Sequence, residues 1–253
     1  MNAGVLHLLS GHAADDRQLS VAETFGPTFQ GEGPSTGRQA LFIRLSRCNL
    51  SCGQGEQARW ACDTPETWDF KRYDPRDPAV ARRQSVESLT AWALGIPARL
   101  VVITGGEPMI QMDGLTRLAR ALHGAGREIE IETNGTFIPI GELVESVHAF
   151  NVSPKLTSAG GRASARIVPA ALRALSESGK ARFKFVISHP SDLVEAAELV
   201  ERFALNEVWV MPEGMSSKAV LDGMRETAEG ALRLGFNLSP RLHTLLWEDE
   251  RGR

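Results

Sequence analysis

The three cysteines of this chain, Cys48, Cys52 and Cys62, all lie between residues 48 and 62. Thiolates are soft ligands that bind zinc ions or iron–sulfur clusters. The six histidines are scattered and form no paired spacing beside the cysteines, so a structural zinc ion would need a distant fourth ligand. Three thiolates on a four-iron cluster would leave one iron free for a catalytic ligand. The spacing alone leaves three interpretations open: buried apolar cysteines, a zinc site and an iron–sulfur cluster.

Two glycine-containing segments offer further chemistry. In "TGGEP" (104–108), Gly105 and Gly106 would let backbone carbonyls approach an ammonium group, and Glu107 would add negative charge. A plain turn has the same composition. The segment "FQGEGPSTGR" (29–38) lacks the Gly-Lys-Ser/Thr ending of a phosphate-binding loop. Gln30 within it offers both a hydrogen-bond donor and an acceptor.

These residues must be positioned by an alternation of strand-like and helix-like segments. We expect strands at 40–46, 99–104, 128–133, 148–153, 181–188 and 206–212, with a short closing segment at 236–240. We expect helices at 85–95, 115–124, 169–179, 191–203 and 217–234. This alternation predicts an α/β fold with a parallel sheet under helical cover. Residues 71–84 have two Asp-Pro turns and are the most loop-like segment.

The unusual segments follow strands. Cys48 onward, "TGGEPM", "ETNG", "SPK" and "MPEG" each begin where an expected strand ends. In parallel α/β folds the chemistry gathers at the carboxyl ends of the strands. The sequence therefore predicts one site to which all five segments contribute.

Composition narrows the class of protein. The chain has 253 residues, 42% hydrophobic and 23% charged, and we expect a single domain over residues 1–253. A net charge of −3 offers no broad basic surface, so we expect no nucleic-acid partner. No apolar run approaches the ~20 residues of a membrane-spanning helix. Residues 1–16 carry only a short apolar stretch and no basic leader, so we expect a cytoplasmic protein, in a compartment where thiols stay reduced.

The order of the motifs resembles a known family. "CNLSC" and "CDT", preceded by "GPTFQGEGPSTGRQALFIRLS" and followed by "TGGEPM", "ETNG" and "SPK", resemble the radical S-adenosylmethionine enzymes. Within them the chain is similar to the 7-carboxy-7-deazaguanine synthase family, from about Ala22 to Trp247. The resemblance implies a partial (β/α) barrel of about six parallel strands. It also implies a lyase of 7-deazapurine (queuosine) biosynthesis that converts 6-carboxy-5,6,7,8-tetrahydropterin to 7-carboxy-7-deazaguanine with loss of ammonia.

The resemblance also assigns residues. Its metal ligands are Cys48, Cys52 and Cys62 for a [4Fe-4S] cluster, and Thr64 for Mg²⁺. Its substrate-binding residues are Phe29, Gln30, Gly31, Glu32, Arg44, Thr104 and His243. Its residues for S-adenosylmethionine are Ala61, Asp63, Gly105, Gly106, Glu107, Glu132, Asn134, Ser153, Pro154, Lys155, Met211, Pro212 and Glu213. For Glu132 and Asn134 the residues themselves leave a strand-capping role equally open.

The chain departs from the family at one place. Nine residues separate Cys52 from Cys62, where the family has two. We expect residues 53–61 to be a surface excursion that enlarges the cluster loop, 48–62, without breaking the three-thiolate clamp, because a longer loop costs little closure entropy when its ends meet. The resemblance further implies a homodimer and an electron-donating reductase such as flavodoxin. Two alternatives are another radical S-adenosylmethionine enzyme, such as a glycyl-radical activase, and a non-catalytic zinc-binding protein.

Overall fold

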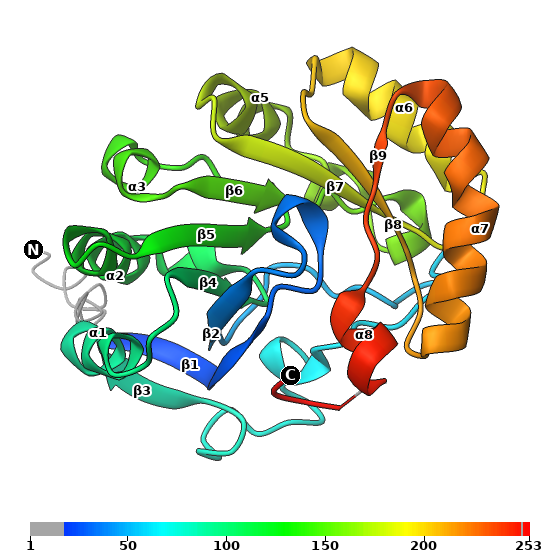
Figure 1. The fold of residues 1–253 in the computed structure, drawn as a ribbon. Coiled ribbons are helices and arrows are strands. Elements are labelled where there is room, and N and C mark those ends of the chain that lie inside the picture. The colour runs from blue at the N-terminus through cyan, green and yellow to red at the C-terminus, as the bar shows by residue number, and fades with distance from the viewer. Residues whose placement is uncertain (1–17, 249) are drawn as a thin grey trace, which may run out of the picture.

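One nine-stranded sheet runs through the computed structural model, which describes residues 18–248 and 250–253 (Figure 1). The strand order is β3-β1-β2-β4-β5-β6-β7-β8-β9. The parallel strands are β2 (Gln39–Leu45), β4 (Leu100–Gly105), β5 (Glu128–Thr133), β6 (Ala149–Val152), β7 (Ala181–Ile187), β8 (Val208–Pro212) and β9 (Asn237–Leu238). Two further strands, β1 (Gln18–Phe29) and β3 (Arg82–Ser85), add to one edge in antiparallel pairs.

The parallel sheet confirms the expected α/β class. Each expected strand is present. The two-residue strand β9 pairs with β8 and adds one more parallel strand to the six that were expected. Within the described residues β3 and β9 form the two edges of the sheet, so the barrel stays open. An open barrel leaves its inner face accessible to a ligand.

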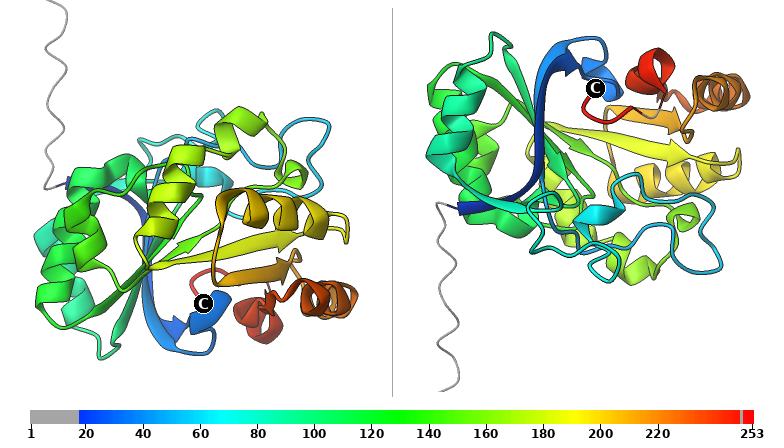
Figure 2. Two further views of the ribbon diagram at one scale, coloured as in Figure 1. Left: turned by 90° about the horizontal axis from the view of Figure 1, so that it is seen from above. Right: turned by 90° about the horizontal axis from the view of Figure 1, so that it is seen from below.

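The helices cover the outer face of the sheet (Figures 1 and 2). This layer is formed by α1 (Val86–Leu94), α2 (Met112–Gly124), α3 (Gly141–Ser146), α5 (Pro169–Glu177), α6 (Asp192–Phe203) and α7 (Ser217–Leu234). The four-residue α4 (Ala163–Arg166) lies between β6 and α5 in the sequence, and α8 (Leu242–Trp247) lies apart from the outer layer. Figure 1 places α8 in front of the sheet, beside the segment that joins β1 to β2.

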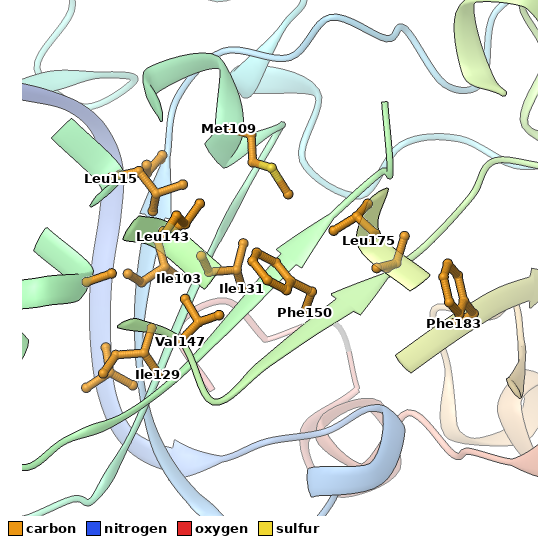
Figure 3. Close-up of a cluster of buried hydrophobic side chains, with 14 of the residues drawn as sticks. Ile103, Met109, Leu115, Ile129, Ile131, Leu143, Val147, Phe150, Leu175 and Phe183 are labelled. Carbon is orange, nitrogen blue, oxygen red and sulfur yellow. The ribbon is translucent and has the colours of Figure 1, made fainter. Parts of the chain in front are cut away.

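The hydrophobic core lies between the sheet and its outer helices. Strand β5 reads "EIEIET", and its Ile129 and Ile131 are fully buried against that layer. Figure 3 shows them with Ile103 of β4, Phe150 of β6 and Leu115 of α2. Each such side chain contributes roughly 1.5–3 kcal/mol when it leaves water. The alternating glutamates of β5 consequently point to the opposite, inner face of the sheet.

Two strands were not expected. Strand β1 lacks a clean alternation because its pairing with β2 shifts register twice, once beyond Val21 and once across Gly26–Pro27. Strand β3, "RRQS", contains no apolar residue and depends on its pairing with β1. The prediction of a loop over 71–84 is therefore wrong at its end, from Arg82 onward. The short helices α3, α4 and α8 were not expected either, because four to six residues give too little periodicity.

Across residues 18–248 and 250–253, no helix combines the length and the apolar character needed to span a membrane. The prediction that residues 1–16 contain no signal peptide concerns residues outside the described ranges.

Candidate active site

The expected site residues gather around one cavity of about 220 Å³ on the inner face of the sheet. All seven expected substrate residues line it: Phe29, Gln30, Gly31, Glu32, Arg44, Thr104 and His243. It is also lined by the expected cofactor and magnesium residues Ala61, Asp63, Thr64, Gly105, Gly106, Glu132, Asn134, Ser153, Lys155, Met211 and Glu213. The expected residues outside the lining are Cys48, Cys52, Cys62, Glu107, Pro154 and Pro212. The strand ends thus converge as the motif positions predicted.

The three thiols are half-buried and form no disulfide. Burial raises the pKa of the Cys48 thiol to about 12, and burial also raises the pKa of Cys52. Thiols in such surroundings ionise only when a cation compensates for the lost hydration, which is what iron or zinc supplies. This donor set fits a metal cluster. Among the described residues, no three His, Cys, Asp or Glu side chains are grouped closely enough to hold a single metal ion.

The segment between Cys52 and Cys62 forms a loop whose two ends lie against each other. Gly53 has φ +85°, and a Cβ placed on it would lie 3.0 Å from the Cα of Ala61 and 3.3 Å from the backbone nitrogen of Cys62. The chain after Cys52 therefore lies directly against the chain before Cys62. The nine residues between these cysteines, seven more than in the family, form a loop whose ends meet, as expected.

The excursion is exposed at 54–57 but docked on the protein at both ends. The backbone N–H of Gly53 donates to Ala159 O at 2.9 Å, and that of Arg59 donates to Ser158 O at 2.8 Å. Gln54 forms an isolated parallel bridge with Gly160. Figure 2 shows the cyan loop lying beside the segment that leads into α4. The loop is thus an anchored part of the site wall.

The glycines of "TGGEP" allow a close approach of two chain segments. A Cβ on Gly105 would lie 2.0 Å from Leu45 O, and one on Gly106 would lie 2.4 Å from Arg47 O and 2.6 Å from the Cβ of Cys48. Any side chain there would push β4 away from the cluster loop. The end of β4 is therefore packed directly against the chain that carries Cys48.

Glu107 is fully buried beneath the cavity. Its carboxylate accepts hydrogen bonds from the hydroxyl of Thr133 at 2.9 Å, from Asn134 N at 2.7 Å and from Met109 N at 3.0 Å. Burial raises the pKa of Glu107 to about 7, and these donors oppose the rise. The side chain braces the end of β4 against the end of β5, so it positions the cavity wall from behind.

The inner face carries a buried group of charges centred on Glu32. Its carboxylate pairs with the ammonium of Lys184 and with Arg241 Nε at 3.2 Å. Burial alone would raise the pKa of Glu32, but Lys184 and Arg241 outweigh it and hold that pKa well below its ordinary range. Burial likewise opposes the charge of Lys184, whose pKa is nevertheless raised by Glu32 and Glu132. Both side chains therefore stay charged at neutral pH.

Polar side chains of β4, β5 and the segment directly after β1 form a second group. Glu132 accepts from Gln30 Nε2 at 3.1 Å and from the Thr104 hydroxyl at 2.7 Å. Gln30 Oε1 also accepts from the backbone N–H of Glu32 at 3.2 Å. The amide of Gln30 is thus oriented by protein contacts at both ends.

Arg44 lies on the inner face with Phe42, which stacks on Phe25 at a centroid distance of 4.9 Å. Its Nε donates to Glu23 Oε1 at 2.7 Å. This contact uses one side of the guanidinium group and leaves the terminal nitrogens for another partner. The alternation of "FIRLS" places Arg44 on the cavity side, as its expected role requires.

The carboxyl-terminal segment closes the cavity against the β1–β2 connection. Leu242 N donates to Gly31 O at 2.8 Å, and a Cβ on Gly31 would lie 2.0 Å from His243 Nδ1. Burial lowers the pKa of His243, and the nearby charge of Glu32 only partly opposes it. The imidazole is therefore neutral at neutral pH.

Sequence reasoning missed several polar residues of the cavity region: Lys184, Arg241, Asn151, Thr133 and Arg253, which line it, and Glu23, which holds Arg44. Lys184 had a detectable signal, because "RFKFV" places a lysine between two buried phenylalanines in a central strand. Asn151 interrupts the short buried strand β6 in the same way. Arg241 and Glu23 lie in segments without a readable pattern, so only the folded chain reveals their partners.

Comparisons with known proteins agree with the family resemblance of the sequence motifs. No family model matches the chain. A 7-carboxy-7-deazaguanine synthase from Pyrobaculum aerophilum is 36% identical and covers 93% of this chain and 98% of its own length. One from Hyperthermus butylicus is 32% identical over 90% of this chain and 92% of its own length.

Solved structures agree with the sequence relatives. QueE from Escherichia coli matches with a TM-score of 0.65 and 27% identity, over 90% of this chain and 98% of that chain. TYW1 with a bound lysine-pyruvate adduct matches in fold alone, with a TM-score of 0.51, 14% identity and coverage of 77% and 72%. The fold is that of the radical S-adenosylmethionine enzymes. The chain belongs to the 7-carboxy-7-deazaguanine synthase family, which makes it an enzyme, a lyase. These relatives do not favour the alternatives of a glycyl-radical activase or a zinc-binding protein.

Proposed function

We propose that this enzyme converts 6-carboxy-5,6,7,8-tetrahydropterin into 7-carboxy-7-deazaguanine with loss of ammonia. The observation that carries the proposal is the single cavity in which all the expected substrate residues meet most of the expected cofactor residues, in a chain whose full-length relatives bear this enzyme's name. When bound, a [4Fe-4S] cluster and S-adenosylmethionine supply the hydrogen-abstracting radical of this enzyme class. The protein contributes binding, orientation and exclusion of water.

The cofactor side is the cluster loop together with the ends of β4, β5, β6 and β8. Cys48, Cys52 and Cys62 are the proposed cluster ligands, and Gly105 and Gly106 present backbone to the S-adenosylmethionine amino group. Lys155 Nζ donates to the Ser153 hydroxyl at 3.0 Å and lies 6.0 Å from the ring of Trp60. Further proposed cofactor contacts come from Ala61, Asp63, Glu132, Asn134, Met211 and Glu213. Pro154, Pro212 and Glu107 shape the wall from outside the lining.

The substrate side recognises the pterin by fixed charge. Because Lys184 and Arg241 keep Glu32 ionised, its carboxylate is a permanent acceptor for pterin N–H groups. The terminal nitrogens of Arg44, which form no hydrogen bond with the residues that the structure describes, are suited to the substrate carboxylate, which a guanidinium group binds through two hydrogen bonds. Thr104, Gln30 and the neutral His243 complete the polar contacts, while Phe29 and Gly31 shape the wall.

Mg²⁺ is the proposed third component. The hydroxyl of Thr64 lines the cavity 3.7 Å from the sulfur of Cys62, which places a hard oxygen donor next to the cluster position. Magnesium retains most of its water and commonly takes only one or two protein oxygens together with substrate oxygens. One hydroxyl is therefore a sufficient protein contribution.

The remaining expectations stay proposals. Unpaired thiols support a reducing, cytoplasmic compartment for this chain. Family resemblance supports an electron donor such as flavodoxin and a homodimer. The lack of a dividing linker in the sequence supports a single domain over 1–253, and a net charge of −3 supports the absence of a nucleic-acid partner.

An anaerobic assay tests the proposal. Reconstituted enzyme is given the carboxytetrahydropterin, S-adenosylmethionine, Mg²⁺ and a reductant, and mass spectrometry follows the product. We expect 7-carboxy-7-deazaguanine, about four irons and four sulfides per chain, and faster turnover with Mg²⁺. Zinc without sulfide, or consumption of S-adenosylmethionine with no deazaguanine at any substrate concentration, would contradict the proposal.

A further inference from the structure

The guanidinium group of Arg241 joins three segments that are far apart in the sequence. Its Nε donates to Glu32 Oε1 at 3.2 Å, its Nη2 donates to Asp63 Oδ2 at 3.0 Å, and its Nη1 donates to Gly214 O at 2.8 Å. The side chain is only 11% exposed and lines the cavity. All three nitrogens of one buried fork are thus engaged in different directions.

Each of these partners lies at a different part of the proposed site. Glu32 belongs to the substrate side, and its other oxygen is held by Lys184. Asp63 directly follows Cys62 and precedes Thr64. Gly214 ends the "MPEG" segment, whose Met211 and Glu213 line the cofactor side. Arg241 therefore stands where the substrate side and the cofactor side meet.

The frame around Arg241 is itself fixed. The next residue, Leu242, donates through its backbone to Gly31 O at 2.8 Å, which ties the carboxyl-terminal segment to the loop of Glu32. Gly214 packs closely on α7, since a Cβ on it would lie 3.1 Å from both the Cβ of Ala219 and the nitrogen of Val220. The side chain of Asp63 is 55% exposed. Arg241 therefore ties the exposed Asp63 to the loop of Glu32 and to the 211–214 segment.

We infer that Arg241 is a positioning residue that holds the end of the cluster loop and the 211–214 segment in register with Glu32. The inference rests on the proposed function. A planar fork reaches three acceptors at once, whereas the single ammonium of a lysine cannot match their directions. Misplacing a reacting group by about 1 Å can cost on the order of 100-fold in rate. Loss of the fork should therefore separate radical formation from its use on the substrate.

Three variants test this role. Arg241→Met removes the fork, and Arg241→Lys keeps the charge alone. Arg251→Met is the matched control, because Arg251 also ties the carboxyl-terminal tail to the chain just beyond the cluster loop, through two 3.2 Å contacts with Glu66, but does not line the cavity. The measurements are iron and sulfide content, turnover, and the ratio of 5′-deoxyadenosine released to deazaguanine formed.

We expect Arg241→Met to bind a full cluster, to lose roughly 10- to 100-fold in turnover, and to release several times more 5′-deoxyadenosine per product than wild type. For Arg241→Lys we expect a turnover and a ratio between those of wild type and Arg241→Met. Arg251→Met should keep the wild-type ratio. A ratio in Arg241→Met equal to that of wild type, with the cluster intact, would overturn the inference. Should Arg241→Met not fold, Arg241→Lys is judged by the same ratio.

A measurement on cluster-free protein separates this inference from the proposed function. Hydrogen exchange of a peptide covering 211–218 should speed up in Arg241→Met and stay unchanged in Arg251→Met, whether or not the enzyme makes deazaguanine. Unchanged exchange at 211–218 in Arg241→Met would also overturn the inference. Absence of product from the wild-type enzyme would instead count against the proposed function.

Discussion

At the scale of single residues, the cavity controls charge through burial and pairing. Glu32 is held ionised by two cations, while burial keeps His243 neutral at a short distance along the same wall. Glu107, which lacks a cation partner in direct contact, is instead stabilised by backbone and hydroxyl donors. A ligand entering this cavity thus meets Glu32 already ionised and His243 already neutral, which lowers the cost of reorganisation on binding.

Arg44→Lys tests the proposed clamp on the substrate carboxylate. Lysine keeps the charge but loses the planar fork that Glu23 orients through Nε. The loss of one charge-assisted pair, worth about 1.5–3 kcal/mol, should raise the substrate KM roughly 10- to 100-fold. Iron content and S-adenosylmethionine binding should remain those of wild type. An unchanged KM would mean that Arg44 serves only its contact with Glu23.

His243→Gln tests the electrostatics of the wall through pH. Burial lowers the pKa of His243, so below its ordinary pKa of about 6.5 the unfolded chain takes up a proton more readily than the folded chain. Stability from the neutral imidazole is therefore present above this pH and lost as the pH falls. Wild type should lose more unfolding free energy between pH 7.5 and pH 5.5 than His243→Gln does.

Urea unfolding of cluster-free protein at both pH values measures this difference. The control is His123→Gln, in the exposed last turn of α2. Equal losses in wild type and His243→Gln would show that the imidazole is not kept neutral by the fold.

At the scale of elements, the enlarged cluster loop is held by backbone contacts with the segment before α4. The carbonyl of Gln54 comes so near Gly160 that a Cβ on Gly160 would lie 2.2 Å from it. The neighbouring Gly161 also has a positive φ, +73° against +78°, but a Cβ there meets nothing within 4 Å. The two glycines therefore share backbone strain and differ in contact with the loop.

Gly160→Ala and Gly161→Ala separate these effects. Alanine at either site should cost about 1–2 kcal/mol from the left-handed backbone alone. Only Gly160→Ala should displace the loop, so the amides of Gly53 and Arg59, which donate to Ala159 and Ser158, should exchange faster in that variant. Hydrogen exchange and urea unfolding measure both quantities. Equal exchange in the two variants would show that the loop does not depend on this contact.

Some strands can be predicted from the sequence and others cannot. Strands with strong apolar runs or strict alternation, such as β4 and β5, were predicted within a residue or two, because their side chains select one face each. Strand β1 was not, since its register shifts and Gly26–Pro27 break the alternation. Strand β3 gains its structure from its partner rather than from its own residues. The path of residues 53–61 was likewise unreadable, because it is set by acceptors a hundred residues away.

The site, too, can be predicted from the sequence only in part. Motif segments at the ends of strands predicted which residues meet, since parallel strands carry their carboxyl ends to one edge. The ion pairs of Glu32 could not be predicted, because its partners Lys184 and Arg241 come from elements with no local link to it. Sequence therefore predicted the motif residues of the cavity but not Lys184, Arg241 or Asn151, and the fold determined the partners of each.

At the scale of the whole molecule, one face of the sheet packs against the hydrophobic core and the other lines the polar cavity. The outer face of β5 presents Ile129 and Ile131 to the helices (Figure 3). The inner face presents Glu130 and Glu132 to the polar interior. Stability should accordingly reside mainly on one face and ligand binding on the other. Neighbouring residues of a single strand can test this division, because they share a backbone and differ only in face.

Ile131→Ala and Glu132→Gln form that pair. Ile131 is fully buried in the helical core, so its truncation should cost about 2–5 kcal/mol of unfolding free energy and leave the substrate KM unchanged at a temperature where the variant is folded. Glu132→Gln keeps the side-chain volume but removes a carboxylate that accepts from Gln30 and Thr104, two proposed substrate contacts. It should therefore raise the substrate KM and cost less than about 1.5 kcal/mol of unfolding free energy. Urea unfolding and steady-state kinetics on the same preparations give the four numbers. A large KM change in Ile131→Ala, or a core-sized stability loss in Glu132→Gln, would show that the two faces are coupled rather than divided.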